Sequence, residues 1–235
     1  WNLWRNTGKD LSGRNISGII RSFVRYEKFI RNKGASNVFE KNYLASVEQF
    51  LERAQYAVKL LDETDYDDLR ERAWREGQVC HGEYNQHNIL MLKGDHLGTA
   101  VTNFGHWSFD IQVADLYRFM RKILEKYNWN LELAGEMLRE YHKIRPISAE
   151  EWKNLRVRFT YPEKYWKLAK LLLFTQKRCG FREKCGKASE SYQTERNLGE
   201  FCRGMFQGLS SVTVRNSCTE QLRKTLTIWG KKVYI

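Results

Sequence analysis

Proline is almost absent from this 235-residue sequence, in which Pro146 and Pro162 are the only two. Because proline interrupts helices and removes a backbone donor, its scarcity favours long helices. Long apolar runs are absent too. The most apolar stretch, KLAKLLLFTQ (residues 167–176), is far shorter than the roughly 20 residues of a membrane span and carries two lysines. The sequence therefore predicts no transmembrane helix.

Cysteine is scarce and scattered, with five residues: Cys80, Cys179, Cys185, Cys202 and Cys218. An odd number at wide spacing suits a reducing compartment better than a disulfide framework. Cys179 and Cys185 lack C-x-x-C spacing and a neighbouring histidine, so a zinc site is not predicted. The chain begins at Trp1, with neither an initiator methionine nor a signal peptide. We expect it to be a piece of a longer protein.

Hydrophobic residues make up 42% of the chain and aromatics 14%, enough for a sizeable core and too much for global disorder. The formal charge of +12 makes anionic partners plausible, such as nucleotide phosphates, nucleic acid or an acidic surface. FVRYEKFIRNK (residues 23–33) and KKVYI (residues 231–235) interleave basic and aromatic residues, as some nucleic-acid binders do. Since no nucleic-acid module is recognisable, solvated helix faces are the preferred interpretation.

Helical periodicity dominates the apolar pattern. It is interrupted once, at residues 88–104, where two short apolar runs flank a Gly-Asp turn that is typical of a β-hairpin. We therefore predict a mainly helical α+β fold with one small buried hairpin. The helices are expected over residues 12–34, 39–61, 65–77, 114–127, 131–143, 148–159, 162–176 and 192–207, whereas the tail, residues 210–235, has no clear period.

The segment CHGEYNQHNIL (residues 80–90) is the candidate chemical motif. Phosphoryl transfer needs a carboxylate near the acceptor hydroxyl and oxygen ligands that hold magnesium against the nucleotide phosphates. In kinases these come from a histidine, an acid two residues later and an asparagine five beyond that, then a hairpin and a second acid before Phe-Gly. His81, Glu83 and Asn88 have this spacing, and TNFG (residues 102–105) follows the expected hairpin. Such a distributed match is more specific than any single triplet.

These phrases, with ADLYRFMRKILEKYNW (residues 114–129) and RVRFTYPEKYWKLAK (residues 156–170), resemble the spore-coat CotS family. That family belongs to the aminoglycoside-phosphotransferase and choline-kinase-like branch of the protein-kinase-like superfamily. The resemblance covers roughly residues 10–208. It implies that residues 1–209 form a kinase-like C-terminal lobe carrying the active-site loops, with the N-terminal lobe absent from this chain and residues 210–235 unassigned.

The resemblance also implies roles for individual residues. Glu83 falls on the catalytic aspartate, Asn88 on the magnesium-binding asparagine and Asn103 on the magnesium-binding aspartate. His81 would hold the turn of the loop. Asp115 matches an acid that ties down catalytic-loop amides, although an acid in the first turn of a helix could equally be a simple dipole partner.

Three departures from the family pattern bear on activity. Glu83 is one methylene longer than aspartate, and misplacement of a catalytic group by about 1 Å can cost on the order of 100-fold in rate. Asn103 replaces an anionic magnesium ligand with a neutral amide, so neither metal position, Asn88 or Asn103, carries a charge. The chain also lacks a Gly-rich loop followed by a strand lysine, which clamps the nucleotide in kinases.

Other conspicuous side chains have a structural and a functional interpretation. His87 and His106 are expected to be surface or supporting residues and not zinc ligands. Three aromatics near the hairpin could line a substrate pocket, and three tryptophans sit on expected helix faces. Packing is the preferred interpretation for both sets. The aromatics near the hairpin are Tyr84, Trp107 and Phe109, and the tryptophans are Trp129, Trp152 and Trp166.

The preferred function is a non-catalytic spore-coat protein without a cofactor. It would be assembled on the forming spore, in the mother-cell cytoplasm, through contacts with other spore-coat proteins and none with a membrane. The alternative is a kinase that transfers a γ-phosphate from ATP-Mg to a small-molecule hydroxyl, with Glu83 as base and Asn88 and Asn103 on the metal. A basic nucleic-acid binder ranks below both.

Overall fold

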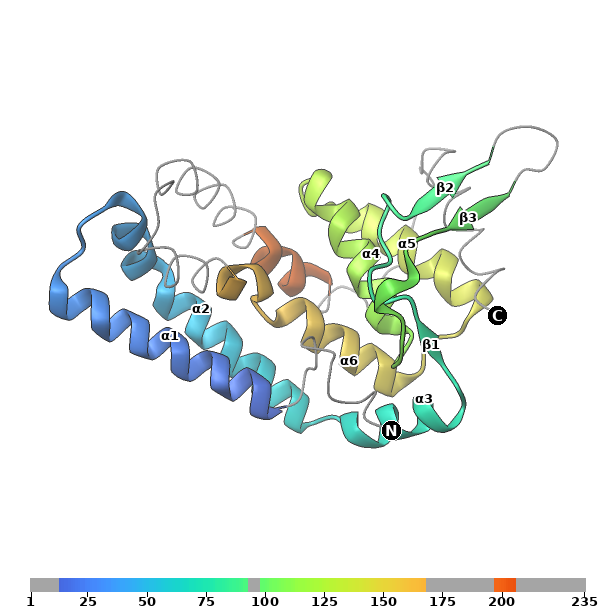
Figure 1. The fold of residues 1–235 in the computed structure, drawn as a ribbon, viewed down its shortest axis with the longest axis horizontal. Helices are drawn as coiled ribbons and strands as arrows, with labels where there is room; N and C mark the ends of the chain where they lie inside the picture. The colour runs from blue at the N-terminus through green and yellow to red at the C-terminus, as the bar shows by residue number, and fades with distance from the viewer. Residues whose placement is uncertain (1–12, 93–97, 168–196, 206–235) are drawn as a thin grey trace. The chain divides into compact units, whose positions relative to one another are not determined.

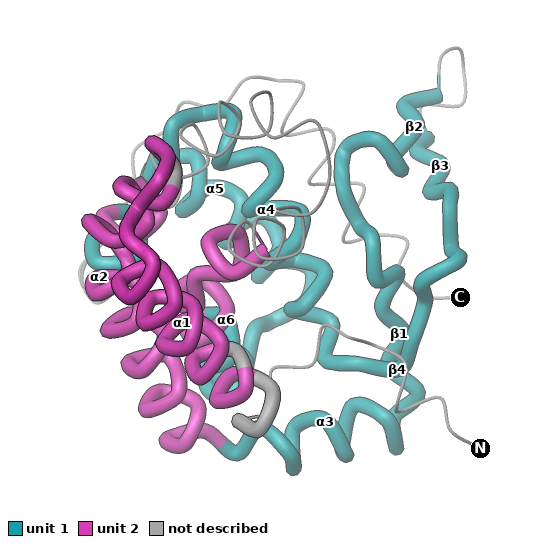
Figure 2. The backbone as a smooth tube through the Cα atoms, turned by 60° about the vertical axis from the view of Figure 1, so that its left-hand side comes forward, with its two compact units in different colours: residues 1–3, 65–155, 201–235 teal, residues 4–64, 156–200 magenta. Residues whose placement is uncertain are grey.

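The computed structural model describes residues 13–92, 98–167 and 197–205 (Figure 1). Within these ranges the chain is mostly helical, with two small antiparallel sheets of two strands each. The chain divides into two compact units, coloured separately in Figure 2. One unit contains residues 65–155 and 201–205, and the other contains residues 13–64, 156–167 and 197–200. The boundary falls inside helix α6 (Ala149–Thr160), after Leu155.

A pair of long helices forms the body of the second unit. Helices α1 (Gly13–Lys33) and α2 (Val38–Asp62) match the predicted ranges to within one residue at each end. Aromatic residues dominate the core between them: the Tyr43 hydroxyl donates to the Phe23 carbonyl (3.1 Å), and the Phe50 and Tyr165 rings stack with centroids 3.9 Å apart. The buried cluster consists of Phe23, Tyr26, Ile30, Tyr43, Val47, Phe50 and Tyr165.

The connection between α1 and α2 is held by a buried carboxylate. Asn37 caps α2, its Oδ1 accepting from the Glu40 amide at 2.9 Å. Glu40, fully buried, accepts from Lys33 Nζ (2.5 Å) and from the Ser36 amide (2.8 Å). Burial alone would raise the pKa of Glu40, but these hydrogen bonds hold it below its ordinary value. The turn is therefore specified by its own polar side chains.

Helices α4 (Val113–Lys126) and α5 (Leu131–Ile144) pack against each other in the first unit, which also contains α3 (Tyr66–Arg75). The side chains buried on these two helices include Leu116, Phe119, Met120, Leu124, Met137 and Leu138. Trp129 is buried as predicted, 5% exposed, but it lies in the α4–α5 connection at φ 57° and not on a helix face. Trp152 is only half-buried, which corrects its predicted core position, whereas Trp166, also half-buried, packs against the aromatic core of the second unit, with its ring centroid 5.2 Å from that of Phe23.

The predicted hairpin is present, as β2 (Ile89–Met91) paired with β3 (Thr99–Val101). It is not buried, however: Leu90 and Met91 are 49% and 45% exposed, which corrects the prediction of a buried hairpin. A second pairing, β1 (Val79–Cys80) with β4 (Ser108–Phe109), was not predicted because two-residue strands are too short to show alternation. The two pairings hold the candidate loop, residues 81–88, at both of its ends.

Several predictions fall outside the described residues, among them the tail, residues 210–235, and most of the helices expected over residues 162–176 and 192–207. The described parts of those two helices, residues 163–167 and 197–205, are helical. In the described ranges no helix combines the length and apolar character that crossing a bilayer requires.

Candidate functional site

The loop that follows β1 passes very close to the short 3-10 helix Phe104–His106, which follows β3. Gly82 is the point of closest approach. It has φ +80°, and a Cβ at this position would lie 2.0 Å from the His106 carbonyl oxygen. Only glycine tolerates both the left-handed backbone conformation and the lack of room for a Cβ atom. The two motif segments, residues 80–90 and 102–105, are therefore brought side by side by backbone contact.

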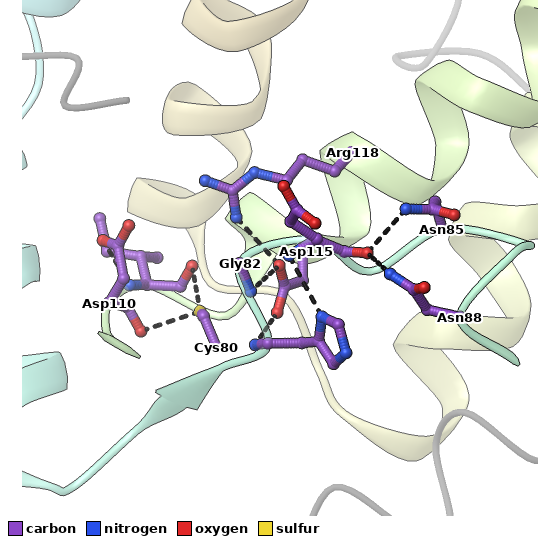
Figure 3. Close-up of polar contacts among 10 residues, drawn as sticks. Cys80, Gly82, Asn85, Asn88, Asp110, Asp115 and Arg118 are labelled. Atoms are coloured by element: carbon purple, nitrogen blue, oxygen red, sulfur yellow. Dashed lines mark hydrogen bonds and ion pairs between the residues drawn. The ribbon is translucent and has the colours of Figure 1, made fainter. Parts of the chain in front are cut away.

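Asp115, in the first turn of α4, anchors the loop through its carboxylate (Figure 3). Oδ2 accepts from the His81 amide, and Oδ1 accepts from the Gly82 amide at 3.1 Å and from Arg118 Nη1 at 2.9 Å. Burial acts to lower the pKa of Arg118, but the neighbouring charge of Asp115 holds it above its ordinary value. Of the two interpretations left open for Asp115, the geometry favours the loop anchor.

His81 is 5% exposed and joins the loop to the end of β3. Its Nδ1 accepts from the Glu83 amide at 3.1 Å, so Nε2 carries the proton and donates to the Thr102 carbonyl at 2.8 Å. The ring also packs on Phe104, with centroids 4.7 Å apart. Both ring nitrogens are thus occupied in holding backbone, which leaves neither for a metal or a substrate.

The backbone carbonyl of Glu83 accepts hydrogen bonds from two side-chain amides. Asn85 Nδ2 and Asn88 Nδ2 each donate to it at 2.8 Å, as the right side of Figure 3 shows. The Asn88 carbonyl in turn accepts from the Thr102 amide at 2.9 Å, next to the β2–β3 ladder. Because Asn88 donates through its nitrogen, its Oδ1 is the atom it could offer to a cation, as a neutral ligand.

Two side chains approach the Glu83 carboxylate: the predicted site residue Asn103, and His106, whereas Asn88 bonds to the Glu83 backbone carbonyl. Oε2 lies 3.4 Å from Asn103 Nδ2, and Oε1 lies 3.6 Å from His106 Nε2. Asn103 has φ 66° and is solvent-exposed, and the Glu83 side chain is 36% exposed. Asn103 therefore turns its amide donor toward the Glu83 carboxylate.

This donor set does not fit magnesium. Mg²⁺ favours carboxylate oxygens in octahedral geometry, whereas Asn88 and Asn103 supply neutral amide oxygens. The one carboxylate, Glu83, already faces an amide N–H and an imidazole. Over the described ranges, no three His, Cys, Asp or Glu side chains gather closely enough to hold a metal ion.

The remaining candidate side chains take different places. His87 is exposed, with its ring nitrogen 2.9 Å from Gln86 Nε2. Tyr84 packs as predicted: it is 6% exposed beside Phe119, and burial raises the pKa of its hydroxyl. Trp107 and Phe109 are 47% and 37% exposed, and they pack on each other, with ring centroids 5.8 Å apart, and not in the core.

Sequence reasoning missed two supporting residues and one contact. The Cys80 thiol lies 3.4 Å from the carbonyls of Asp110 and Ile111, an arrangement that no local pattern predicts. Arg118 follows Asp115 at i+3, and this spacing on a predicted helix could have identified the ion pair. The contact of His106 with Glu83 depends on the close approach at Gly82, for which the sequence carries only a glycine as a sign.

The chain is similar to known proteins in both sequence and fold. The family model described as "Spore coat putative kinase YutH" matches residues 24–202. Spore coat protein S of Bacillus subtilis (strain 168) is 18% identical over 149 residues, covering 63% of this chain and 42% of that protein. An aminoglycoside phosphotransferase structure from Alicyclobacillus acidocaldarius superposes with a TM-score of 0.74 at 16% identity, covering 89% of this chain and 61% of that one. The chain thus spans less than two thirds of either relative, and the structural likeness shows a kinase-like fold.

Proposed function

Because the chain belongs to the YutH family of kinase-like spore coat proteins, we propose that it acts in the spore coat without catalysing phosphoryl transfer. In this proposal residues 1–209 form a kinase-like C-terminal lobe that serves assembly. Other spore-coat proteins are its partners, and it joins the forming spore from the mother-cell cytoplasm of an endospore-forming bacterium. The family and the name of spore coat protein S support the location.

One observation carries the non-catalytic part of the proposal, which is the pairing of Glu83 with Asn103. In a working site both positions would be carboxylates: the one at residue 83 would accept the hydroxyl proton, and the one at residue 103 would hold a magnesium ion that offsets its charge. Here an amide donor already faces the carboxylate, at 3.4 Å from Asn103 Nδ2 to Glu83 Oε2. Two neighbouring carboxylates repel each other unless a cation offsets their charge. A carboxylate and an amide donor attract each other without one.

The alternative is an ATP-Mg-dependent phosphotransferase acting on a small-molecule hydroxyl. The observation in its favour is the intact scaffold around the loop, with the Asp115 carboxylate on two loop amides and Asn88 on the Glu83 carbonyl. Glu83 would then accept the hydroxyl proton, and Asn88 and Asn103 would face the cation. A scaffold of this kind also serves a protein that has kept the fold and lost the chemistry.

The variant Asn103→Asp tests the proposal. It places a second carboxylate about 3.4 Å from Glu83, and two unscreened carboxylates repel each other. We expect the variant to melt several degrees below the wild type in EDTA, with the loss recovered by magnesium, more so with ATP present. The wild type should show no magnesium-dependent change. The measurement is a thermal-shift series in EDTA, magnesium, and magnesium with ATP at constant ionic strength.

Asn128→Asp is the matched control, since Asn128 is also an exposed asparagine with a left-handed backbone, at φ 49°. This change should leave the melting temperature insensitive to magnesium. If Asn103→Asp behaves like Asn128→Asp, Asn103 does not lie at a metal position and the mapping is wrong. If the wild type itself is stabilised by magnesium with ATP, the alternative function replaces the proposal.

A further inference from the structure

Helix α1 carries a line of cations on its solvent side. Arg21, Arg25 and Lys28, separated by four and three residues, lie on one face of the helix, and all three are exposed. We call these three residues the basic stripe. Within the described part of the chain none of them forms an ion pair, whereas Arg31 pairs with Glu27 (2.8 Å) and Lys33 with Glu40 (2.5 Å). Carboxylates of α1 and α2 therefore neutralise the cations at the C-terminal end of α1, whereas the basic stripe faces solvent.

Exposed apolar side chains flank the basic stripe on both sides. Val24 is 49% exposed and Phe29 is 47% exposed. The opposite face of α1, which includes Phe23 and Tyr26, is buried in the aromatic core of its unit. The helix thus cannot turn its apolar face to a lipid surface without unfolding that core. The solvent side of α1 therefore presents a row of positive charges between two exposed apolar side chains.

We propose that the basic stripe docks an acidic protein segment. Charge complementarity selects the partner: carboxylates spaced along a helix or strand match cations one turn apart, and the +12 charge of the chain attracts an acidic partner from a distance. Phe29 could pack on either partner, but Val24 favours a peptide over a nucleic acid, because an aliphatic side chain can contact other aliphatic side chains and cannot stack on a base. This inference holds whether or not the site near Glu83 is catalytic.

Charge reversal of the basic stripe tests the inference. The triple variant Arg21→Glu, Arg25→Glu and Lys28→Glu is compared with the wild type by fluorescence anisotropy. The probes are a labelled peptide of repeated Glu-Glu-Leu-Glu units and a labelled single-stranded oligonucleotide of equal charge. The wild type is expected to bind the peptide more tightly than the oligonucleotide, with affinity falling as salt rises. The triple variant should lose at least about 10-fold in peptide affinity.

A second triple variant, Lys41→Glu, Lys122→Glu and Lys153→Glu, changes the net charge equally at exposed positions scattered over three helices. It should lose about 3-fold or less, and Val24→Ser should weaken peptide but not oligonucleotide binding. Equal losses in both triple variants would reduce the effect to net charge and overturn the inference. Tighter binding of the oligonucleotide would assign the basic stripe to nucleic acid, and a wild type that binds no peptide would end the proposal. Far-UV circular dichroism of each variant confirms that it is folded.

Discussion

Replacing Asp115 with alanine is expected to destabilise the protein by about 3–5 kcal/mol. The change leaves the Arg118 guanidinium, 19% exposed, without its carboxylate, and removes the acceptor of the His81 and Gly82 amides. Removing one partner of a buried ion pair costs more free energy of folding than the pair itself contributes, because the remaining charge stays desolvated. Urea unfolding followed by circular dichroism measures the loss.

Asp67→Ala is the control for this result. Asp67 also lies in the first turn of a helix, α3, but it is exposed. If an acid at such a position acts only through the helix dipole, its removal costs about 1 kcal/mol or less. Similar losses for Asp115→Ala and Asp67→Ala would show that Asp115 is a dipole partner and that the loop does not depend on it.

Gly82→Ala is expected to cost about 3 kcal/mol, because two penalties combine. An alanine at φ +80° is strained by roughly 1–2 kcal/mol. Its Cβ would also lie 2.0 Å from the His106 carbonyl, so the loop and the Phe104–His106 turn must move apart. Separation would also lengthen the contact between Glu83 and His106, at present 3.6 Å. Chemical denaturation gives the stability change.

Gly77→Ala separates the two penalties. Gly77 has φ +65°, and a Cβ there meets no atom within 4 Å, so only the backbone strain remains. We expect about 1–2 kcal/mol for this variant. A Gly82→Ala variant no less stable than Gly77→Ala would mean that the two motif segments do not touch as described.

The helical framework could be predicted because its signals are local. Apolar periodicity and end signals such as Asn37, which caps α2, and Gly34, which has φ +80°, lie within a few residues of what they determine. The hairpin was predicted for the same reason. Its burial was predicted wrongly because the residues Leu90 and Met91 are apolar but exposed, and a short apolar run does not show whether anything covers it.

The sequence offered candidate site residues but did not show their contacts. Spacing identified His81, Glu83 and Asn88, and the Phe-Gly pair identified Asn103. The approach of His106 to the Glu83 carboxylate depends on two strands of two residues and on one glycine, none of which has a periodic signal. Long-range contacts of this kind depend on tertiary packing, and a single sequence carries little trace of them.

In our proposal, an asparagine at position 103 gives the physical reason for the contacts around Glu83. With an amide at this position, the Glu83 carboxylate has a donor at 3.4 Å and an imidazole at 3.6 Å, and it requires no cation for stability. The hydrogen bonds that anchor the loop, from the His81 and Gly82 amides to the Asp115 carboxylate, do not involve Asn103. We therefore expect the loop to keep its conformation whether residue 103 is an asparagine or an aspartate.

Calorimetric titration of the wild-type protein with ATP, in excess magnesium and in EDTA at equal ionic strength, tests this account most directly. Neutral amides add little to magnesium affinity, so we predict either no binding in both buffers or dissociation constants within about twofold of each other. Tightening by about tenfold or more in magnesium, equal to roughly 1.4 kcal/mol, would contradict the account. Loss of that tightening in Asn103→Leu would place the ion at the position that we describe as unable to hold it.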